Sequence, residues 1–177
     1  FFYNLTEGAN LLSFPLITEN NEIEIFFDND NPDLISNFNI PSSLISIISE
    51  GVMSLCQSGF GGEYVCVGSL DEISTNKGYW LILENTDSLT IDEAVPSSIN
   101  EDNLVYDLHS GNNLVSHPYS VAQPIDDAID NFYLSSIFAI AGSAKAVQYT
   151  NGNWYGSLEH LNPSSGYWLV TYGDMQF

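Results

Sequence analysis

The sequence has almost no positive charge. Lys77 and Lys145 are its only Lys or Arg residues, against 23 Asp plus Glu, and the formal net charge is −21. Nucleic acids and anionic lipid headgroups are bound mainly through cationic side chains, so this balance excludes them as partners. The acidity is typical of a saline, calcium-containing medium, where cations relieve self-repulsion; the alternative is that it serves only solubility.

Long apolar stretches are also missing. No run approaches the ~20 residues that cross a bilayer, so no membrane insertion is expected. Hydrophobic residues still make up 44% of the 177 residues and aromatics 13%, enough for a folded core in one large or two small domains. The chain begins Phe1-Phe2-Tyr3, without Met or a basic signal segment. We expect it to be a processed piece of a longer secreted precursor.

Cysteine is scarce, with two residues in the chain, Cys56 and Cys66. Two cysteines alone cannot complete a tetrahedral zinc site. Three glycines lie between them, which predicts a turn that places the two on adjacent hairpin strands, within bridging range. We expect a disulfide, typical of an oxidising compartment; the alternative is two free buried thiols.

The most informative feature is a set of three segments that occur twice in the same order. Asn10–Leu16 (NLLSFPL) returns as Asn113–Tyr119 (NLVSHPY), Gly68–Leu70 (GSL) as Gly156–Leu158, and Gly78–Leu81 (GYWL) as Gly166–Leu169. A recurring order of this kind predicts a duplicated structural unit. We divide the chain into repeat unit 1 (1–92), a linker (93–103) and repeat unit 2 (104–177); the alternative is one compact domain holding both.

Each unit predicts a similar series of elements: a strand closed by proline, a short helix, a buried strand, a hairpin and a closing Gly-Tyr-Trp-Leu strand. The helix is clearest at 124–130, with proline at its first position and acids in its first turn, and its counterpart is 22–27. Asn151-Gly152 predicts a tight hairpin turn. We therefore predict an α+β fold, mostly antiparallel β, of two pseudo-symmetric units with one short helix each; the alternative is all-β.

Spacing also suggests how the two hairpins correspond. Counted from Gly51 and Gly142, Cys56 aligns with Val147. A disulfide at Cys56 would then be a local feature of unit 1 and no part of the repeated fold.

The repeated pattern resembles a module found in tandem in large secreted surface proteins of marine and anaerobic bacteria, of the form L-x-x-G-W-N-L-I-S-x-P followed by a hairpin and a closing G-Y-W. The resemblance covers nearly the whole chain and implies an accessory module without a known chemistry. Ala9 and Asn112 replace the usual Trp of the pattern. The matching residues are Leu5, Gly8, Asn10, Leu11, Ser13, Pro15, Gly68, Leu70 and Gly78–Trp80, and Leu108, Gly111, Asn113, Leu114, Ser116, Pro118, Gly156, Leu158, Leu161, Pro163 and Gly166–Trp168.

Sequence patterns of common enzyme classes are absent. There is no Gly-x-Ser-x-Gly, no phosphate-binding loop and no dinucleotide fingerprint. His109, His117 and His160 have no further ligand at helical or hairpin spacing, which argues against zinc. His117 takes the repeat position of Phe14, so we expect it to face the core. We predict that the protein is not an enzyme and contains no catalytic residues.

Adjacent carboxylates are the remaining catalytic alternative. Asp71-Glu72 and Asp126-Asp127 offer the paired acids that a glycosidase uses. Acids next to each other in a turn or a helix's first turn are far more often solvated surface, which is the interpretation adopted here.

An acidic loop in unit 1 is the best metal candidate. Asp28, Asp30 and Asp33 offer hard oxygen ligands within six residues, together with Asn29 and Asn31. Calcium takes six to eight such oxygens, although the spacing does not follow the EF-hand pattern. The alternatives are a calcium site and a solvated loop, and no other cofactor is expected.

Two groups of aromatic residues suggest binding surfaces. Tyr149, Trp154 and Tyr155 could form a platform on which a sugar stacks, because Trp154 and Tyr155 have no Trp counterpart in unit 1. The apolar start, Phe1, Phe2 and Tyr3, is a candidate assembly element that lends a strand to a neighbouring sheet edge.

The function predicted from these features is a non-catalytic extracellular structural or interaction module at the cell surface, adhesive or filament-forming. Its partners would be other protein subunits or other domains of a longer chain. The first alternative is a carbohydrate-binding accessory module of a secreted enzyme, with a glycan as ligand. The second is a hydrolase, which requires a cleft joining His117 or His160 to a carboxylate and a serine.

Overall fold

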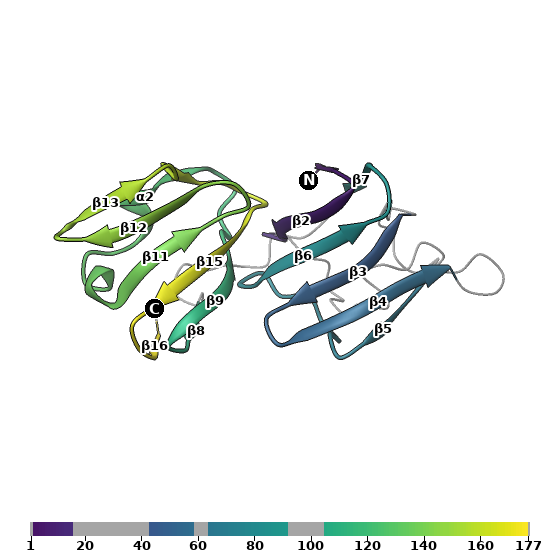
Figure 1. Ribbon diagram of the computed structural model, residues 1–177, viewed down its shortest axis with the longest axis horizontal. Coiled ribbons are helices and arrows are strands. Elements are labelled where there is room, and N and C mark those ends of the chain that lie inside the picture. The colour runs from purple at the N-terminus through teal and green to yellow at the C-terminus, as the bar shows by residue number, and fades with distance from the viewer. Residues whose placement is uncertain (1, 16–42, 59–63, 92–104, 177) are drawn as a thin grey trace. The chain divides into compact units, whose positions relative to one another are not determined.

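The computed structural model describes residues 2–15, 43–58, 64–91 and 105–176. The described residues group into two compact units. The first holds 2–10, 43–58, 64–75 and 79–91, and the second holds 11–15, 76–78 and 105–176. A five-stranded sheet is the main element of each unit (Figure 1).

The first sheet is built from five strands, of which β6, β3, β4 and β5 pair antiparallel in that order. Two further strands, β1 (Phe2–Leu5) and β7 (Asp87–Thr90), form a separate antiparallel pair. The strand order of the first sheet is β2 (Gly8–Ser13), β6 (Gly78–Leu83), β3 (Leu44–Ser49), β4 (Val52–Ser58), β5 (Tyr64–Gly68).

The second sheet is antiparallel throughout. Two short antiparallel pairs accompany it: β8 (Asp107–Leu108) with β16 (Met175–Gln176), and β10 (Gln123–Pro124) with β14 (His160–Leu161). The strand order of the second sheet is β9 (Gly111–Ser116), β15 (Gly166–Thr171), β11 (Ile137–Ala141), β12 (Ala146–Thr150), β13 (Asn153–Gly156).

The two sheets have the same topology. In each, β2 or β9 lies at one edge, the Gly-Tyr-Trp-Leu strand lies beside it, and the three remaining strands follow in chain order (Figure 1). Even an irregularity recurs, because the register of β3 on β6 shifts between Leu44 and Ser46 and that of β11 on β15 shifts between Ile137 and Ala139. A shared bulge at the same place shows that the backbone path itself is repeated.

The repeated asparagine explains why its position recurs. Oδ1 of Asn113 accepts a hydrogen bond from the His109 N–H, and Nδ2 donates to the carbonyls of His109, Gly111 and Leu169. Asn10 makes the same set of bonds, to Thr6, Gly8 and Leu81. One side chain thus satisfies backbone groups of the turn that leads into β2 or β9 and ties that turn to the Gly-Tyr-Trp-Leu strand.

Gly68 and Gly156 are repeated because each lies against backbone. A Cβ at Gly68 would collide with the Met53 carbonyl oxygen, and one at Gly156 with that of Ala146. The same two carbonyls accept hydrogen bonds from the N–H groups of the next two residues, the Ser-Leu of each motif. Only glycine allows this close approach.

The two repeated tyrosines are buried and hold a loop. The Tyr79 hydroxyl accepts a hydrogen bond from the Ser74 N–H at 2.7 Å, and that of Tyr167 accepts one from the Asn162 N–H, also at 2.7 Å. Burial raises the pKa of Tyr79 to about 12, against a smaller lowering by its hydrogen bond to the Ser74 backbone. The hydroxyl therefore stays protonated near neutral pH.

The inward faces of both sheets are aliphatic and aromatic. In the first unit the core includes Leu5, Ile47, Leu81 and Leu89, each at most 1% exposed. In the second unit the buried cluster contains Tyr106, Leu108, Ile125, Ile129, Leu134, Ile137, Ile140, Val147, Leu158, Tyr167 and Leu169.

The predicted α+β class is wrong, and the all-β alternative fits. Strands account for 57% of the structure and helices for 5%. The described residues contain one α-helix, α2 (Ile125–Ala128), and one 3-10 turn, η2 (Leu134–Ser136). The predicted counterpart at 22–27 lies outside the described residues, as does the proposed linker at 93–103.

Local side-chain chemistry explains why α2 is a single turn. The chain becomes extended at Ile129, with φ −130° and ψ 123°. Asp130 then accepts a hydrogen bond at its side chain from the Phe132 N–H and at its carbonyl from the Tyr133 N–H. Such an aspartate-centred turn competes with helix continuation, and Phe132, which follows it, is 81% exposed.

Candidate functional site

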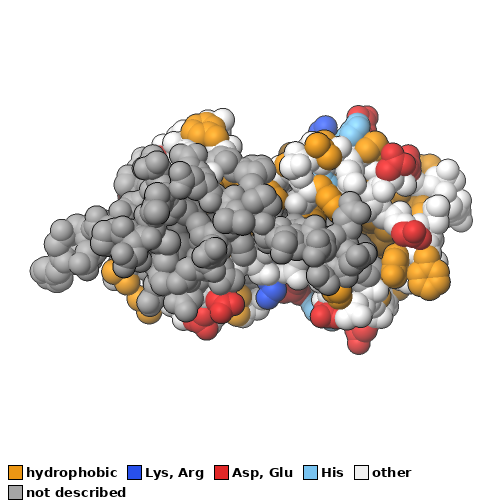
Figure 2. Space-filling model, turned by 180° about the vertical axis from the view of Figure 1, so that it is seen from behind, with side chains coloured by type: hydrophobic (Ala, Val, Ile, Leu, Met, Phe, Trp, Pro, Cys, Tyr) orange, Lys and Arg blue, Asp and Glu red, His pale blue; other side chains and the backbone are white. Residues whose placement is uncertain are grey.

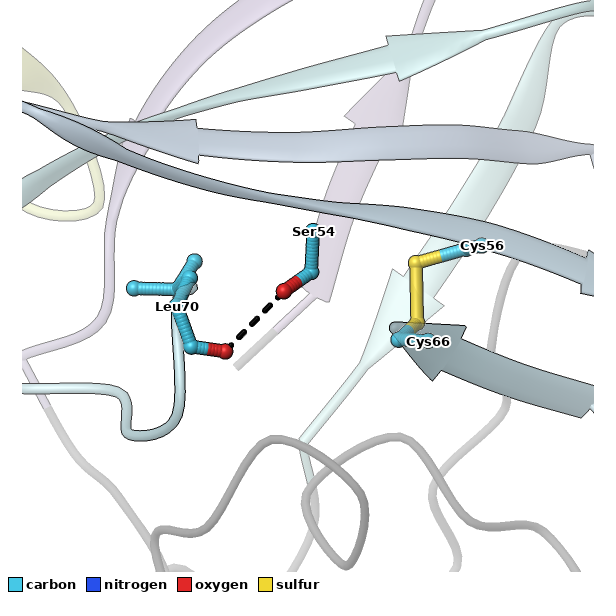
Figure 3. The surroundings of a disulfide bond; sticks show 4 residues. All are labelled: Ser54, Cys56, Cys66 and Leu70. Carbon is cyan, nitrogen blue, oxygen red and sulfur yellow. Dashed lines mark hydrogen bonds between the residues drawn. A yellow bond between two sulfur atoms is a disulfide. The ribbon is translucent and has the colours of Figure 1, made fainter. Parts of the chain in front are cut away.

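The predicted disulfide is present in the first unit. Cys56 on β4 and Cys66 on β5 are directly opposite residues, both buried, and a bond joins their sulfurs (Figure 3). Next to it, Ser54 Oγ donates a hydrogen bond to the Leu70 carbonyl at 3.0 Å (Figure 3). The hairpin is therefore fixed both covalently and to the loop that follows it.

The strand register corrects how the two hairpins correspond. Ser54 pairs with Ile47, which pairs with Leu81. In the second unit Val147 pairs with Ile140, which pairs with Leu169 of the same motif. Val147 thus corresponds to Ser54, and the alignment of Cys56 with Val147 by glycine spacing is wrong.

Two residues further along, the positions of the disulfide are taken by aromatic residues. Tyr149 and Trp154 are directly opposite each other on β12 and β13, just as Cys56 and Cys66 are on β4 and β5. Their ring centroids are 5.0 Å apart at an interplanar angle of 60°. An aromatic contact in one unit therefore stands where the other has a covalent bond.

The structure does not place the three predicted platform residues on one face. Tyr149 and Trp154 are half-buried against the core of the second unit, whereas Tyr155 is 57% exposed and pairs with exposed Gln148 on the other face of the sheet. Trp154 and Tyr155 are consecutive residues of β13, and consecutive side chains of a strand point to opposite faces of the sheet. The tight turn at Asn151 and Gly152, with φ of 51° and 79°, fixes that register.

Tyr149 and Trp154 line a groove, here called the β12–β13 groove, with a volume of about 430 Å³. Acidic and amide side chains face it beside the two rings. Its lining is Ile125, Asp126, Asn131, Leu134, Val147, Tyr149, Gly152, Asn153, Trp154, Gly156, Leu158 and Glu159.

A second hollow in the same unit, the His117 pocket, has a volume of about 240 Å³ and a mainly apolar lining without a charged side chain. It lies between β9, α2, β11 and β15. Its lining is Tyr106, Val115, Ser116, His117, Pro118, Tyr119, Gln123, Ala128, Ile129, Ile140, Leu161, Tyr167 and Leu169.

His117 is the most perturbed group in this pocket. Its side chain is 2% exposed, as expected for a residue at the position of Phe14, and burial lowers its pKa below the usual 6.5. Its Nε2 lies 2.9 Å from the Val121 carbonyl oxygen, which can only accept, so Nε2 carries the hydrogen. In the neutral ring Nδ1 is then an acceptor, and among the described residues none hydrogen-bonds to it.

Two tyrosines lie close to this histidine. The ring of Tyr119 is 5.5 Å from that of His117, centroid to centroid. The Tyr106 hydroxyl donates to the Ser116 carbonyl and contacts its Oγ, both at 3.2 Å. Burial raises the pKa of Tyr106, and Tyr119 adds to the rise, so the phenol is neutral.

Among the described residues, neither of the two hollows joins a histidine to both a carboxylate and a serine, as the hydrolase alternative requires. The His117 pocket includes Ser116 but no carboxylate, and the β12–β13 groove includes carboxylates but no histidine. His160 is exposed on β14, and exposed His109 contacts the Ser110 carbonyl through Nδ1.

The structure describes two of the three predicted assembly residues and none of the predicted metal ligands. The acidic loop with Asp28, Asp30 and Asp33 lies outside the described residues, as does Phe1; within the described ranges no group of three His, Cys, Asp or Glu could hold a metal ion. The two other assembly candidates, Phe2 and Tyr3, lie on β1, which pairs with β7. Phe2 is 61% exposed, and Tyr3 is buried.

Acidic side chains of the described residues are spread over the surface in Figure 2, among exposed hydrophobic ones, while lysine is sparse. No described helix is both long and apolar enough to cross a membrane.

Sequence reasoning identified the aromatic pair but neither hollow. The one signal for the His117 pocket was the replacement of Phe14 by histidine in an otherwise repeated segment. A polar residue at a repeated core position marks a place where the two copies differ in more than packing.

Comparison with protein-family models finds no match to this chain, and comparisons with curated proteins and with solved structures find none either.

Proposed function

We propose that the protein is a non-catalytic extracellular structural module that binds other protein subunits and is adhesive or filament-forming. The observation that carries the proposal is the outward face of β3, β4, β5 and β6 in the first unit. On that face contiguous apolar side chains are exposed, although the chain has 23 acidic residues available for its surface.

The strand register shows that this outward face is continuous. Leu55 and Val67 are directly opposite each other and are 57% and 64% exposed. On the next row, Met53 pairs with Ile48, which pairs with Trp80. The exposed large hydrophobic residues on these strands are Ile45, Met53, Leu55, Val65 and Val67, with Ile48, Trp80 and Ile82 half-buried.

Charge argues for a second copy of the chain as the occupant of this face. Two molecules of net charge −21 repel each other, and they can approach closely only through surfaces that bring no carboxylates together. The outward face has none among the residues named above. Contiguous exposed apolar surface of this kind marks protein contact sites, and salt would assist the contact by screening the remaining charge.

The disulfide supports an extracellular location, because such bonds persist in oxidising compartments. The separation of histidine from carboxylates in the two hollows supports a non-catalytic role.

Sedimentation velocity of the full chain at low salt and at about 0.5 M NaCl tests the proposal, because that salt shortens the screening length several-fold. We expect larger particles at high salt, and Leu55→Glu with Val67→Glu to abolish them. The matched control is Gln148→Glu with Tyr155→Glu, at the corresponding positions of the second sheet, which should leave assembly unchanged. A wild-type chain that stays monomeric at both salt concentrations would refute self-association.

A second candidate function, saccharide binding, is favoured by the β12–β13 groove. The half-buried rings of Tyr149 and Trp154 offer a stacking surface, and Asp126, Asn153 and Glu159 offer hydrogen-bond partners for hydroxyls. Aromatic stacking beside a few polar groups is a common way to hold a sugar.

A glycan array followed by titration of the best ligand tests this candidate. Trp154→Ala should weaken binding at least tenfold, and Tyr155→Ala, on the other face of the same strand, should leave it unchanged. Silence of the array, or equal effects of both variants, would rule the groove out as a sugar site.

A further inference from the structure

We propose that the His117 pocket binds a small uncharged molecule with an apolar body and one hydroxyl or N–H group, which donates a hydrogen bond to Nδ1 of His117. This site is separate from both surfaces discussed above. It lies inside the second unit and shares no lining residue with the β12–β13 groove.

The imidazole of His117 has one nitrogen without a described hydrogen bond. Val121 fixes Nε2 as the donor, and the lowered pKa keeps the ring neutral, so Nδ1 is an acceptor without a described partner. A buried acceptor without a partner costs free energy. A ligand that donates one hydrogen bond removes that cost, and it does so only if it can enter the space that the ring lines.

The lining of the His117 pocket is mainly apolar and uncharged. Its aliphatic part includes Ile129, Ile140 and Leu169, all buried, and favours an apolar body. None of the lining side chains is charged, which disfavours an ionic ligand, because its charge would lose hydration without gaining a counter-charge.

Most other polar groups of the lining are paired or half-buried. The Tyr106 hydroxyl bonds to Ser116, and the Tyr167 hydroxyl accepts from Asn162. Tyr119 and Gln123 also line the pocket, but both are half-buried, so water can reach their polar atoms. Nδ1 of His117 is therefore a buried acceptor without a described partner in a mainly apolar setting, which favours a ligand with a donor for it.

The repeated segment itself distinguishes the histidine from a residue of the shared fold. The first copy of that segment, Asn10–Leu16, has Phe14 at the corresponding position, fully buried. A phenyl ring has no acceptor to satisfy, so the histidine is not required for the shared fold. The change to histidine provides the second copy with a hydrogen-bond acceptor that the first copy lacks at this place.

The experiment compares two probes of the same shape, indole and benzofuran, which differ by the N–H group. Full-length protein is titrated with each and followed by two-dimensional NMR. We expect saturable binding of indole, with shift changes at Val121, Ala128 and Ile140, and binding of benzofuran weaker by roughly fivefold, the usual effect of one lost hydrogen bond.

Two variants connect the binding to this pocket. His117→Phe removes the acceptor and should weaken indole binding at least tenfold, and it installs the ring that the first copy has at this position. Ala128→Leu fills the pocket from α2 without touching the histidine and should also weaken binding. His160→Phe, an exposed histidine outside the pocket, is the control and should bind indole as the wild type does.

The proposal is overturned by any of three results: no saturable binding of indole up to its solubility limit, equal affinity for indole and benzofuran, or unchanged binding in both pocket variants while their circular dichroism remains that of the folded wild type.

Discussion

The two units have the same strand order and the same repeated backbone contacts. They differ in the side chains at the hairpin, in the pocket and on the outward face of the sheet. Strand order, the bulge and the asparagine that bonds three carbonyls are the same in both. The disulfide of the first unit is replaced by an aromatic pair in the second, and the buried Phe14 by His117. The repeated residues satisfy or make room for buried backbone groups. The residues that differ between the units lie at the hairpin, in the His117 pocket or on the outward face of a sheet.

This difference indicates where to look for function in a duplicated protein. A repeated residue such as Gly68 or Gly156 is explained by local geometry alone, because any Cβ there meets a carbonyl oxygen. A position that diverged, such as Leu55 against Gln148, is free of that constraint. Divergent positions that gather on one surface or in one pocket are therefore the better candidates for binding.

The largest expected effect is a loss of stability on truncating a core leucine, and it tests whether the cores of the two units contribute equally to the free energy of unfolding. Leu81→Ala and Leu169→Ala remove corresponding buried side chains, 0% and 2% exposed, and each should lower the free energy of unfolding by about 2–5 kcal/mol. Urea unfolding followed by tryptophan fluorescence measures both. The half-buried neighbours serve as controls, and Ile82→Ala or Val170→Ala should cost clearly less. A loss below about 0.5 kcal/mol for one leucine alone would mean that the two cores are not equivalent.

The second prediction concerns the disulfide of the first hairpin, which is removed there and introduced at the corresponding positions of the second hairpin. Cys56→Ala with Cys66→Ala should lower the free energy of unfolding by about 2–3 kcal/mol, because a loop of this length loses that much closure entropy when bridged. Tyr149→Cys with Trp154→Cys, at the corresponding opposite positions, should form a new disulfide under mild oxidation. Thiol titration counts the free cysteines. Two titratable thiols after oxidation would contradict the structural correspondence of the two hairpins.

The third prediction concerns the repeated asparagine. Asn113→Ala should cost about 1–3 kcal/mol, since buried carbonyls and an N–H lose their partner. Asn10→Ala should cost less, because Asn10 is half-buried and water can replace part of its bonding. Chemical denaturation gives both values, and exposed Asn112→Ala is the control, expected within ±0.5 kcal/mol of wild type. An Asn10 effect larger than that of Asn113 would contradict the burial argument.

The smallest effect is a pH dependence confined to the second unit. The folded state holds His117 neutral with a pKa below 6.5, so the unfolded chain binds the proton first as the pH falls below 6.5. The contribution of the neutral ring to stability is complete above pH 6.5 and decreases from there toward the lower folded pKa. Unfolding free energies at pH 7.5 and 5.5 should differ less in His117→Phe than in wild type, whereas His160→Phe should keep the wild-type difference.

Several features of the fold follow from local sequence. Asn151-Gly152 predicted a tight hairpin turn, and both residues have the positive φ that such a turn requires. Each unit was expected to have a buried strand before its hairpin, and β3 (Leu44–Ser49) and β11 (Ile137–Ala141) are those strands. The disulfide was expected because the three glycines between the two cysteines predicted a turn, and a bond does join Cys56 and Cys66.

Longer-range features were missed or misjudged. The helix predicted at 124–130 ends after one turn, because Asp130 bonds the backbone that would have continued it. Glycine spacing misaligned Cys56 by two residues, since register depends on which strand pairs with Leu81 and Leu169 and not on loop length. Tyr155 was grouped with Tyr149 and Trp154 although it lies on the opposite face of the sheet.

Local sequence was enough to show that the chain contains one unit twice, that its net charge of −21 repels polyanions, and that a tight hairpin turn lies at Asn151-Gly152. Each of these depends on local backbone preference or on total charge, which need no partner strand. Strand pairing was needed to show that Cys56 and Tyr149 occupy corresponding positions and that Leu55 and Val67 form an exposed apolar pair. It was also needed to show that His117 lines a pocket and that its Nδ1 has no described partner. These are set by strand register, and a slip of one residue in register turns every side chain to the other face of its sheet.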